Sequence, residues 1–252
     1  TIDQSIANNV QKYFCVSTDK AANPVNMMGA SKRIMEMFLM KKSDEIDIST
    51  ARFANVAFSD GSLLYGFNQR IHKKQPLAAP KDVKRYFVTP KEAGELCLLS
   101  GLLGNNREIF FPKLSKRLNL ISFDQIAIEF LNQLGYDPVI CDSENEARDS
   151  VKQLSKENKW PCYFFKTNTT GEKDFEEFYT NDEIIDLKSF YNIGVINSEL
   201  KYEENKLDYF LEKIEEIKNK ETWKKNDIIK LFNKMIPNFN HMETNKYLDD
   251  RM

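Results

Sequence analysis

The sequence predicts an α/β fold in which helices connect parallel strands. Short runs rich in β-branched and aromatic residues alternate along the chain with longer segments whose apolar residues recur at helical spacing. The first such unit consists of a strand at residues 13–16 (YFCV), a helix at 27–40 and a second strand at 46–56 (IDISTARFANV). A helical crossover of this length joins parallel strands, so we expect these two strands to run in the same direction.

Composition limits the classes of function that the chain can have. The chain has 252 residues, which is enough to bury a full core, and a formal net charge of -2 at pH 7. Acidic and basic residues are mixed throughout, so we expect neither a nucleic-acid partner nor a membrane-binding surface. No apolar run approaches the roughly 20 residues that a membrane span requires, and the first residues (TIDQ) do not resemble a signal peptide. We therefore expect a cytoplasmic protein without a membrane span.

The cysteines and histidines show no pattern typical of a disulfide framework or a metal site. The cysteines lack CxxC spacing, and three of the four lie in apolar runs, which is typical of buried thiols in a reducing cytoplasm. The two histidines lie far apart and have no ligand-like partners at metal spacing, so we expect no bound metal. These residues are Cys15, Cys97, Cys141, Cys162, His72 and His241.

Between the second strand and residue 111, capping residues and prolines divide the chain. The sequence SDGS at 59–62 provides a helix cap, and Thr89-Pro90 supplies a capping hydroxyl followed by a proline in the first helical turn. The intervening segment 75–83 contains prolines and is expected to be irregular. In chain order, these signals predict a helix at 63–74, a strand at 84–88, a helix at 91–103 and a strand at 108–111.

The second half of the chain continues the alternation and ends in two charged helices. Each of these two helices has apolar residues on one side, and we expect them to have a structural or interfacial role. In chain order, the sequence predicts a helix at 122–134, a strand at 137–141, a helix at 143–158, a strand at 160–166, and helices at 203–220 and 222–235.

Polar residues are concentrated where the first strand ends. Ser17, Thr18, Asp19 and Lys20 follow that strand directly, and Lys32 lies early in the next helix, facing back toward the strand end. Ligands of open α/β sheets bind outside the carboxyl ends of the strands, so we expect a site here. An ordinary turn or helix cap is the alternative, because such residues form both very often.

Five motifs, in order along the chain, resemble one protein family. The sequence STDKAANPVNMMGASK is followed by RFANV, GS, KRYFVTPKEA and TGEKDFEE. These motifs resemble the extended short-chain dehydrogenase/reductase family and, within it, the nucleotide-sugar 4,6-dehydratases that act on UDP-N-acetylglucosamine. The similarity is greatest to the dehydratases of legionaminic acid biosynthesis. Some of those use the GDP-linked sugar, so the resemblance does not decide whether the nucleotide is UDP or GDP.

The resemblance implies a fold and an activity. The fold would be the C-terminal part of a Rossmann-type parallel sheet, interleaved with a small α/β substrate-binding domain and C-terminal helices. Residues 1–120 would form the C-terminal half of the NADP-binding domain, with substrate-loop excursions at 57–90, and residues 121–252 the substrate-binding domain and helical extension. A homo-oligomer using NADP would convert the nucleotide sugar to its 4-keto-6-deoxy form, for bacterial surface-glycan or nonulosonic acid biosynthesis.

Matching positions imply catalytic roles for five residues. Thr18 would hydrogen-bond the C4 hydroxyl, Asp19 would protonate the departing C6 hydroxyl, and Lys20 would take the C5 proton. Lys32 matches the lysine that binds the nicotinamide ribose. Met28 stands where most of the superfamily has a tyrosine base, although one branch of the dehydratases shares this methionine. A thioether cannot carry a proton, so our hypothesis is that Asp19 or Lys20, through a water, deprotonates the C4 hydroxyl.

The remaining matches imply binding roles. Gly61 and Ser62 precede a helix whose free N–H groups suit a diphosphate, although an ordinary cap explains them as well. Arg85 has a planar fork of donors that also suits a diphosphate. The implied cofactor contacts are Ser17, Lys32, Asn55 and Val56. The implied substrate contacts are Asn55, Gly61, Ser62, Arg85, Glu172 and Lys173.

The sequence contains no GxGxxG motif, although in this family a glycine-rich phosphate loop precedes STDK. We therefore expect the chain to be the C-terminal piece of an NADP-dependent lyase. An alternative is a non-catalytic chain that acts at most as a sugar-nucleotide-binding or oligomerisation module, because a half sheet exposes an unpaired edge. A nucleotide-sugar 4-epimerase is a further alternative, which is weaker because an epimerase needs the C4 base but no elimination pair.

Overall fold

The computed structural model describes residues 1–113, 120–168, 173, 176–199, 203–237, 239 and 241. The chain divides into two compact units. Unit 1 comprises Thr1–Ala54, Lys91–Ser115 and Glu176–Glu243, and unit 2 comprises Asn55–Pro90, Lys116–Phe175 and Thr244–Met252.

A five-stranded sheet with the strand order β1-β2-β6-β11-β10 organises unit 1. Its first three strands are parallel, and the pairing of β1 with β2 extends from Lys12 opposite Asp47 to Thr18 opposite Phe53. The predicted parallel pairing is therefore confirmed. The last two strands are antiparallel and were not predicted from the sequence. The strands are β1 (Lys12–Thr18), β2 (Asp47–Phe53), β6 (Glu108–Pro112), β10 (Ile184–Asp186) and β11 (Ile193–Asn197).

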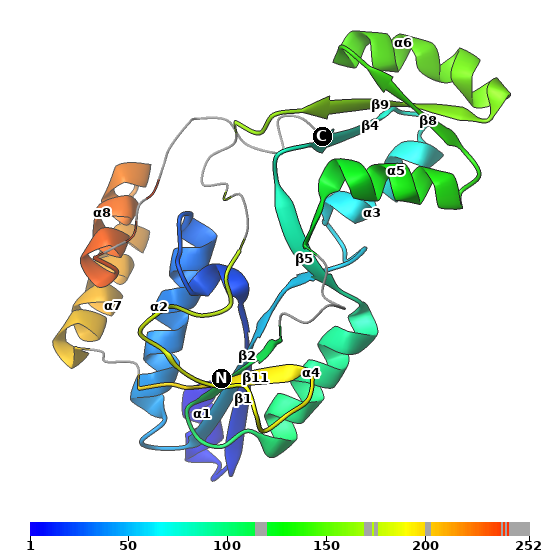
Figure 1. Ribbon diagram of the computed structural model, residues 1–252. Helices are drawn as coiled ribbons and strands as arrows, with labels where there is room; N and C mark the ends of the chain where they lie inside the picture. The colour runs from blue at the N-terminus through cyan, green and yellow to red at the C-terminus, as the bar shows by residue number, and fades with distance from the viewer. Residues whose placement is uncertain are drawn as a thin grey trace. The chain divides into compact units, whose positions relative to one another are not determined.

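Helices cover both faces of this sheet, because alternate side chains of each strand point in opposite directions (Figure 1). Cys15 of β1 packs with Met35 and Leu39 of α2, whereas its neighbour Phe14 packs with Leu96 of α4. The helices of unit 1 are α1 (Ile2–Ala7), α2 (Met27–Lys42), α4 (Pro90–Leu103), α7 (Glu204–Lys218) and α8 (Lys225–Met235).

The two C-terminal helices pack against α2 inside unit 1. Leu207 and Phe210 of α7 join Leu231 of α8 in one apolar cluster with Ala30 and Ile34 of α2. The apolar sides of these helices are buried on α2, which places the helices in unit 1. The range 121–252, which was predicted to form the substrate-binding domain and helical extension, is therefore divided between the two units. The excursion predicted at 57–90 falls within the first segment of unit 2.

Unit 2 contains two three-stranded sheets, in the orders β4-β9-β8 and β3-β5-β7. In Figure 1, α6 lies on one face of the first sheet and α3 and α5 lie on the other. Phe67, Leu77, Leu131 and Trp160 are buried in the core of this unit. The elements are β3 (Asn55–Val56), α3 (Leu63–His72), β4 (Leu77–Pro80), β5 (Lys84–Val88), β7 (Leu120–Ser122), α5 (Phe123–Gln133), β8 (Asp137–Cys141), α6 (Glu144–Leu154) and β9 (Lys159–Phe165).

Segment 75–83 differs from its prediction because it contains a strand, β4. Leu77 and Ala79 are buried, and the strand pairs in parallel with β9 up to Pro80. β4 is an edge strand, where a proline without an N–H group is tolerated. The prolines therefore mark the ends of a short strand here and do not indicate irregular backbone.

Several smaller features complete the comparison with the predictions. The strand expected at 46–56 is divided into β2 and β3, and the helix expected at 143–158 ends at Leu154. Cys141 and Cys162 are buried as predicted, whereas Cys15 and Cys97 are only partly buried.

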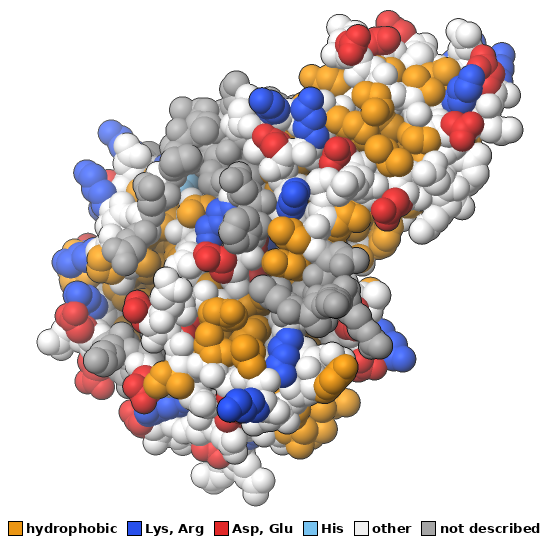
Figure 2. Space-filling model, in the orientation of Figure 1, with side chains coloured by type: hydrophobic (Ala, Val, Ile, Leu, Met, Phe, Trp, Pro, Cys, Tyr) orange, Lys and Arg blue, Asp and Glu red, His pale blue; other side chains and the backbone are white. Residues whose placement is uncertain are grey.

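Figure 2 shows basic and acidic side chains interspersed on the visible face. Within the described ranges, no helix is long and apolar enough to cross a membrane.

Candidate active site

The polar residues after β1 form a short turn at the carboxyl end of that strand. β1 ends at Thr18, and Asp19–Ala21 form a single 3-10 turn. We call this turn, together with Thr18, the catalytic turn, after the roles that the sequence predicts for Thr18, Asp19 and Lys20. Oδ1 of Asp19 accepts hydrogen bonds from Thr18 Oγ1 at 2.7 Å, from the Lys20 backbone N–H at 2.9 Å and from Lys20 Nζ at 3.1 Å. The predicted acid and base thus form a contact ion pair.

Burial differs between the two partners of this ion pair. The side chain of Asp19 is 2% exposed, whereas that of Lys20 is 21% exposed. The carboxylate is therefore held by the protein, while the ammonium can also reach solvent. The two groups are close enough together to act on neighbouring atoms of one bound sugar, as a paired acid and base require.

Gly29 allows α2 to approach the catalytic turn closely. A Cβ atom at this position would lie 2.5 Å from the carbonyl oxygen of Lys20, closer than any real contact. The backbone N–H of Gly29 donates to Oδ1 of Asn26, the N-cap of α2, at 2.8 Å. Glycine therefore lets the first turn of the helix rest on the backbone of the predicted base.

Met28 and Lys32 lie on the same face of α2, because residues four apart in a helix are neighbours. Nζ of Lys32 lies 3.5 Å from the carbonyl oxygen of Val16, so this side chain faces the strand end as predicted. Met28 is 49% exposed. The methionine thus has the same spacing from the lysine as the missing tyrosine, and its part in catalysis stays a prediction.

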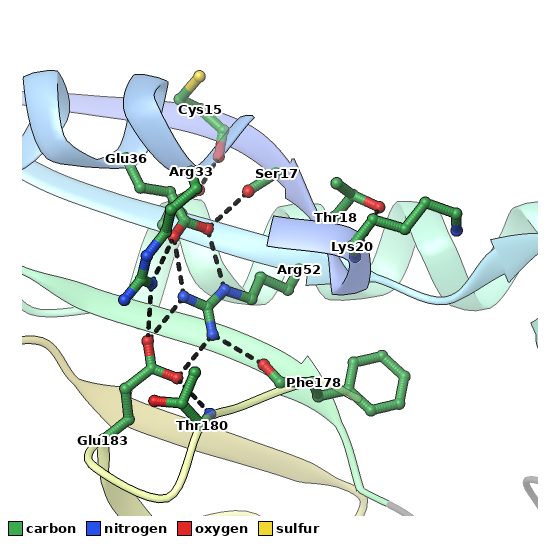
Figure 3. A network of polar contacts seen from close by, with 11 residues as sticks. Cys15, Ser17, Thr18, Lys20, Arg33, Glu36, Arg52, Phe178, Thr180 and Glu183 are labelled. Carbon is green, nitrogen blue, oxygen red and sulfur yellow. Dashed lines mark hydrogen bonds and ion pairs between the residues drawn. The ribbon is translucent and has the colours of Figure 1, made fainter. Parts of the chain in front are cut away.

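Ser17, a predicted cofactor contact, is buried and hydrogen-bonded within the protein. Its hydroxyl donates to Oε1 of Glu36 on α2 at 2.6 Å. This bond connects the residue just before the catalytic turn to a cluster of buried charges (Figure 3). A contact of Ser17 with a cofactor stays a prediction.

The buried cluster is centred on Arg52 of β2. Its guanidinium contacts both carboxylate oxygens of Glu36, at 2.9 and 2.8 Å, and both oxygens of Glu183, at 2.7 and 2.8 Å. It also donates to the carbonyl oxygen of Phe178 at 2.8 Å. Arg33 bridges the same two carboxylates, at 3.2 Å to Glu36 and 3.0 Å to Glu183. We call Arg33, Glu36, Arg52 and Glu183 the charge cluster.

The positive members of the charge cluster keep its carboxylates ionised. Burial alone would raise the pKa of Glu36, but Arg52, Arg33 and the hydroxyl of Ser17 together lower it below its ordinary value. For Glu183, burial is likewise outweighed by Arg52 and Arg33, which lower its pKa to about 2. Both carboxylates are therefore charged at neutral pH, and Arg52 is held between them as a cation.

The charge cluster was not predicted from the sequence. Arg52 begins the RFANV motif, but its partners are distant in the sequence and carry no motif of their own. One signal was available: Arg52 interrupts a strand that is otherwise rich in small and apolar residues, and a buried arginine is rare unless it is paired.

Four of the predicted binding residues lie near the beginning of unit 2. Asn55 and Val56 form β3, which pairs in parallel with β5. Gly61 has a φ of 72°, a conformation that favours glycine. Ser62 is the N-cap of α3 and accepts a hydrogen bond from the backbone N–H of Tyr65 at 3.1 Å. The structure therefore brings Gly61 and Ser62 together at a helix N-terminus, as predicted.

Arg85 and Lys173 also lie in unit 2 and contact each other. Arg85 is buried, and its Nη1 donates to the backbone carbonyl oxygens of Lys84 at 2.8 Å and Lys173 at 2.9 Å. This guanidinium nitrogen thus fixes the backbone beside a predicted substrate contact. Glu172, the other predicted contact in that motif, lies outside the described residues.

The polar groups near the carboxyl end of β1 are of the kind that could hold one end of a nicotinamide dinucleotide. The hydroxyl of Thr18 and the ammonium groups of Lys20 and Lys32 are donors at the carboxyl end of a parallel strand, and such donors suit ribose hydroxyls. The chain contains no GxGxxG segment to hold the diphosphate. Among the described residues, no group of His, Cys, Asp or Glu side chains could hold a metal ion.

The chain is similar to bacterial proteins that are longer than itself. It is 35% identical over 116 residues to the capsular polysaccharide biosynthesis protein CapD of Staphylococcus aureus, which covers 44% of this chain and 19% of CapD. It is 28% identical over 220 residues to a UDP-glucose 4-epimerase of Rickettsia rickettsii, which covers 84% of this chain and 55% of the epimerase. The chain thus spans at most about half the length of these relatives.

Solved structures share the fold at low sequence identity. Pen from Bacillus thuringiensis matches with a TM-score of 0.61 and 23% identity, over 80% of this chain and 57% of that chain. The DesIV double mutant from Streptomyces venezuelae, a dTDP-glucose 4,6-dehydratase with NAD and DAU bound, matches with a TM-score of 0.51 and 14% identity, over 70% of this chain and 53% of that chain. These similarities show that the chain has the Rossmann-type α/β fold that was predicted.

The family assignment comes from the sequence. The profile of the family described as "Polysaccharide biosynthesis protein" matches residues 1–198, which include the whole of the catalytic turn, the charge cluster and all the predicted binding residues. The chain therefore belongs to the polysaccharide biosynthesis protein family.

Proposed function

We propose that the chain provides the catalytic turn of an NADP-dependent nucleotide-sugar 4,6-dehydratase that acts on UDP- or GDP-N-acetylglucosamine. The observation that most directly supports this proposal is the ion pair of Asp19 and Lys20 at the carboxyl end of β1. Membership of the polysaccharide biosynthesis protein family supports a product destined for a surface glycan. The sequence motifs favour a nonulosonic acid such as legionaminic acid as the final sugar.

The first proposed step removes the proton of the C4 hydroxyl. Thr18 Oγ1 donates to Asp19 at 2.7 Å, so a proton from the sugar can reach the carboxylate through this hydroxyl or through a water. A bound nicotinamide dinucleotide would accept hydride from C4 and later return it to C6. Lys32, facing the strand end, would orient the ribose that lies beside this reaction.

The second proposed step is elimination of water across C5 and C6. Once Asp19 is protonated, it no longer stabilises the ammonium of Lys20, which is partly exposed and can release a proton to solvent. The neutral amine then takes the C5 proton, while Asp19 protonates the C6 hydroxyl and water leaves. The C5–C6 double bond forms, and the two side chains return to the ion pair seen in the structure. When hydride returns to C6, the Lys20 ammonium would give its proton to C5, and the neutral amine would then regain a proton from solvent.

A product assay tests this proposal. The 252-residue chain, and any longer chain that the gene encodes, would be incubated with NADP and each N-acetylglucosamine nucleotide, and the products analysed by NMR. A 4-keto-6-deoxy sugar is the expected product, and its absence with both chains would favour the non-catalytic alternative. Asp19→Asn and Lys20→Ala should each lower the rate by about 1,000-fold, the middle of the range for a general acid or base. Near-normal C4 oxidation in both variants would contradict the proposed base.

A nucleotide-sugar 4-epimerase is the second candidate. Similarity to the Rickettsia rickettsii UDP-glucose 4-epimerase over 84% of this chain supports it. An epimerase needs a base at C4 and no acid and base at C5 and C6, whereas this chain has Asp19 and Lys20 and has Met28 in place of the phenol. The same NMR assay separates the two, because a 4-epimer formed without loss of water would favour the epimerase.

A further inference from the structure

The charge cluster takes no part in the proposed chemistry, although it lies directly beside the catalytic turn. Arg52 and Glu36 are completely buried, and the side chain of Glu183 is 9% exposed. Removing charges from water is costly, and buried ion pairs can often be replaced by apolar residues without loss of stability. Stability alone is therefore a weak explanation for this cluster.

Arg52 joins three segments that are far apart in the sequence. It lies on β2, its first carboxylate partner Glu36 lies on α2, and its other partners, Phe178 and Glu183, lie in residues 176–183. Glu183 also accepts a hydrogen bond from the backbone N–H of Thr180 at 2.9 Å. Residues 176–183 are thus connected to the sheet by the Arg52 guanidinium (Figure 3). The rings of Phe178 and Tyr179 also pack on Phe111 of β6.

The same segment is connected to both sides of the catalytic turn. Ser17, just before the turn, donates to Glu36 at 2.6 Å, and Glu36 is bonded to Arg52. Asn23, just after the turn, donates through Nδ2 to Oε2 of Glu177 at 2.8 Å. Movement of residues 176–183 would therefore be transmitted to Ser17 and Asn23, which lie on either side of Asp19 and Lys20.

Arg52 also lies close in sequence to a point where the chain leaves unit 1. The chain passes into unit 2 at Asn55, three residues after Arg52, and re-enters unit 1 at Glu176, two residues before Phe178. Within unit 1, the Arg52 guanidinium thus connects the end of the segment that precedes unit 2 with the beginning of the segment that follows it.

We propose that Arg52 is a positioning residue that holds the catalytic turn and residues 176–183 in a single arrangement. The planar guanidinium is essential to this role, because it contacts two carboxylates and a carbonyl oxygen in different directions. Loss of the fork would leave Asp19 and Lys20 in place but free to move by fractions of an ångström. The inference rests on the proposed function for its effect on rate, but its structural part can be measured without a substrate.

The test compares Arg52→Lys with the matched control Arg107→Lys. Lysine keeps the positive charge and removes the fork, so the fold is expected to be retained. Arg107 is also an arginine of unit 1 with a carboxylate partner, Asp44, but it lies at the amino end of β6. Glu183→Gln serves as a second variant, because it weakens the connection of residues 176–183 and leaves Arg52 and Glu36 paired.

The first readout is hydrogen exchange measured by mass spectrometry on the chain without substrate. Arg52→Lys should increase exchange both in residues 176–183 and in residues 17–23, and Glu183→Gln should do so to a smaller extent. Arg107→Lys should change neither segment. Unchanged exchange in residues 17–23, with increased exchange in 176–183, would overturn the proposal whether or not the protein turns over a nucleotide sugar.

The second readout is the steady-state rate of the longest form of the protein that is active. Because a displacement of about 1 Å at a reacting group can cost about 100-fold, Arg52→Lys should lower kcat by about 10- to 100-fold at a temperature where the variant is folded. The KM for NADP should change little. A kcat within twofold of the parent's would overturn the proposal, whereas absence of turnover by the parent would contradict the proposed function alone.

Discussion

Two arginines of unit 1 lie at opposite ends of the parallel strands and in opposite surroundings. Arg52 is near the carboxyl end of β2, and its guanidinium is completely buried between two carboxylates. Arg107 precedes β6 at the amino end, and the side chains of its ion pair with Asp44 are 43% and 65% exposed. The same residue type in the same sheet is therefore desolvated at one end and hydrated at the other.

The comparison teaches that burial, and not the number of ion pairs, decides what a charge does. An exposed arginine keeps most of its hydration whether or not it is paired, so its partner adds little to the stability of the fold. A buried arginine must find partners with nearly ideal geometry, and in doing so it fixes the segments that supply them. The buried arginine lies at the end of the sheet that contains the catalytic turn.

Substitution by alanine should show the largest difference between the two ends. Arg52→Ala leaves two buried carboxylates without their main partner, and we expect it to lower the free energy of unfolding by about 3–5 kcal/mol. Arg107→Ala should lower it by less than about 1 kcal/mol. Urea unfolding of both variants measures the two values, and equal losses would mean that burial does not distinguish the two arginines.

Acid should weaken the carboxyl end of the sheet through Glu183. Its pKa is about 2 in the folded protein, against an ordinary value of 4.5, so its contribution is complete above about pH 5 and is lost as the pH falls toward 2. This shift corresponds to a contribution on the order of 3 kcal/mol. Glu36 has a lowered pKa and acts in the same direction.

Unfolding free energies measured between pH 7 and pH 3 provide the check for this pH dependence. The parent chain should lose stability steadily below pH 5. Glu183→Gln should be less stable at neutral pH and should show a flatter profile in acid, because the titrating carboxylate is gone. An identical slope for parent and variant would show that Glu183 does not contribute to the acid sensitivity.

The smallest expected difference concerns two glycines in helices of unit 1. Gly29→Ala places a Cβ atom 2.5 Å from the carbonyl oxygen of Lys20, and we expect a loss of about 1–3 kcal/mol from this overpacking. Gly94→Ala on α4 meets no atom within 4 Å and should be stabilising by up to about 1 kcal/mol. Thermal unfolding compares the two variants, and a neutral Gly29→Ala would mean that α2 can move away from the turn without cost.

Local patterns in the sequence predicted much of the fold. The β1–α2–β2 unit and its parallel pairing followed from apolar periodicity and from the crossover length. The prediction of irregular backbone at 75–83 was wrong, because the pairing of this segment with β9 depends on residues that lie far along the chain. The strands β10 and β11 were missed for the same reason, since each is short and takes its strand conformation from its neighbours in the sheet.

The candidate site was predicted in part. The polar residues after β1 were expected at one strand end, and the structure places Asp19 and Lys20 there in contact. The engagement of Ser17 by Glu36 and the close approach of Gly29 to Lys20 could not be predicted, because both depend on how α2 packs.

The sequence by itself determined where the catalytic turn lies in the chain and that it contains Thr18, Asp19 and Lys20, because these features depend on neighbouring residues. Only the tertiary structure decided what surrounds that turn. Arg52 is separated along the chain from Glu36 by 16 positions and from Glu183 by 131 positions. They become partners because β2, α2 and residues 176–183 are buried together, and burial makes pairing of their charges obligatory.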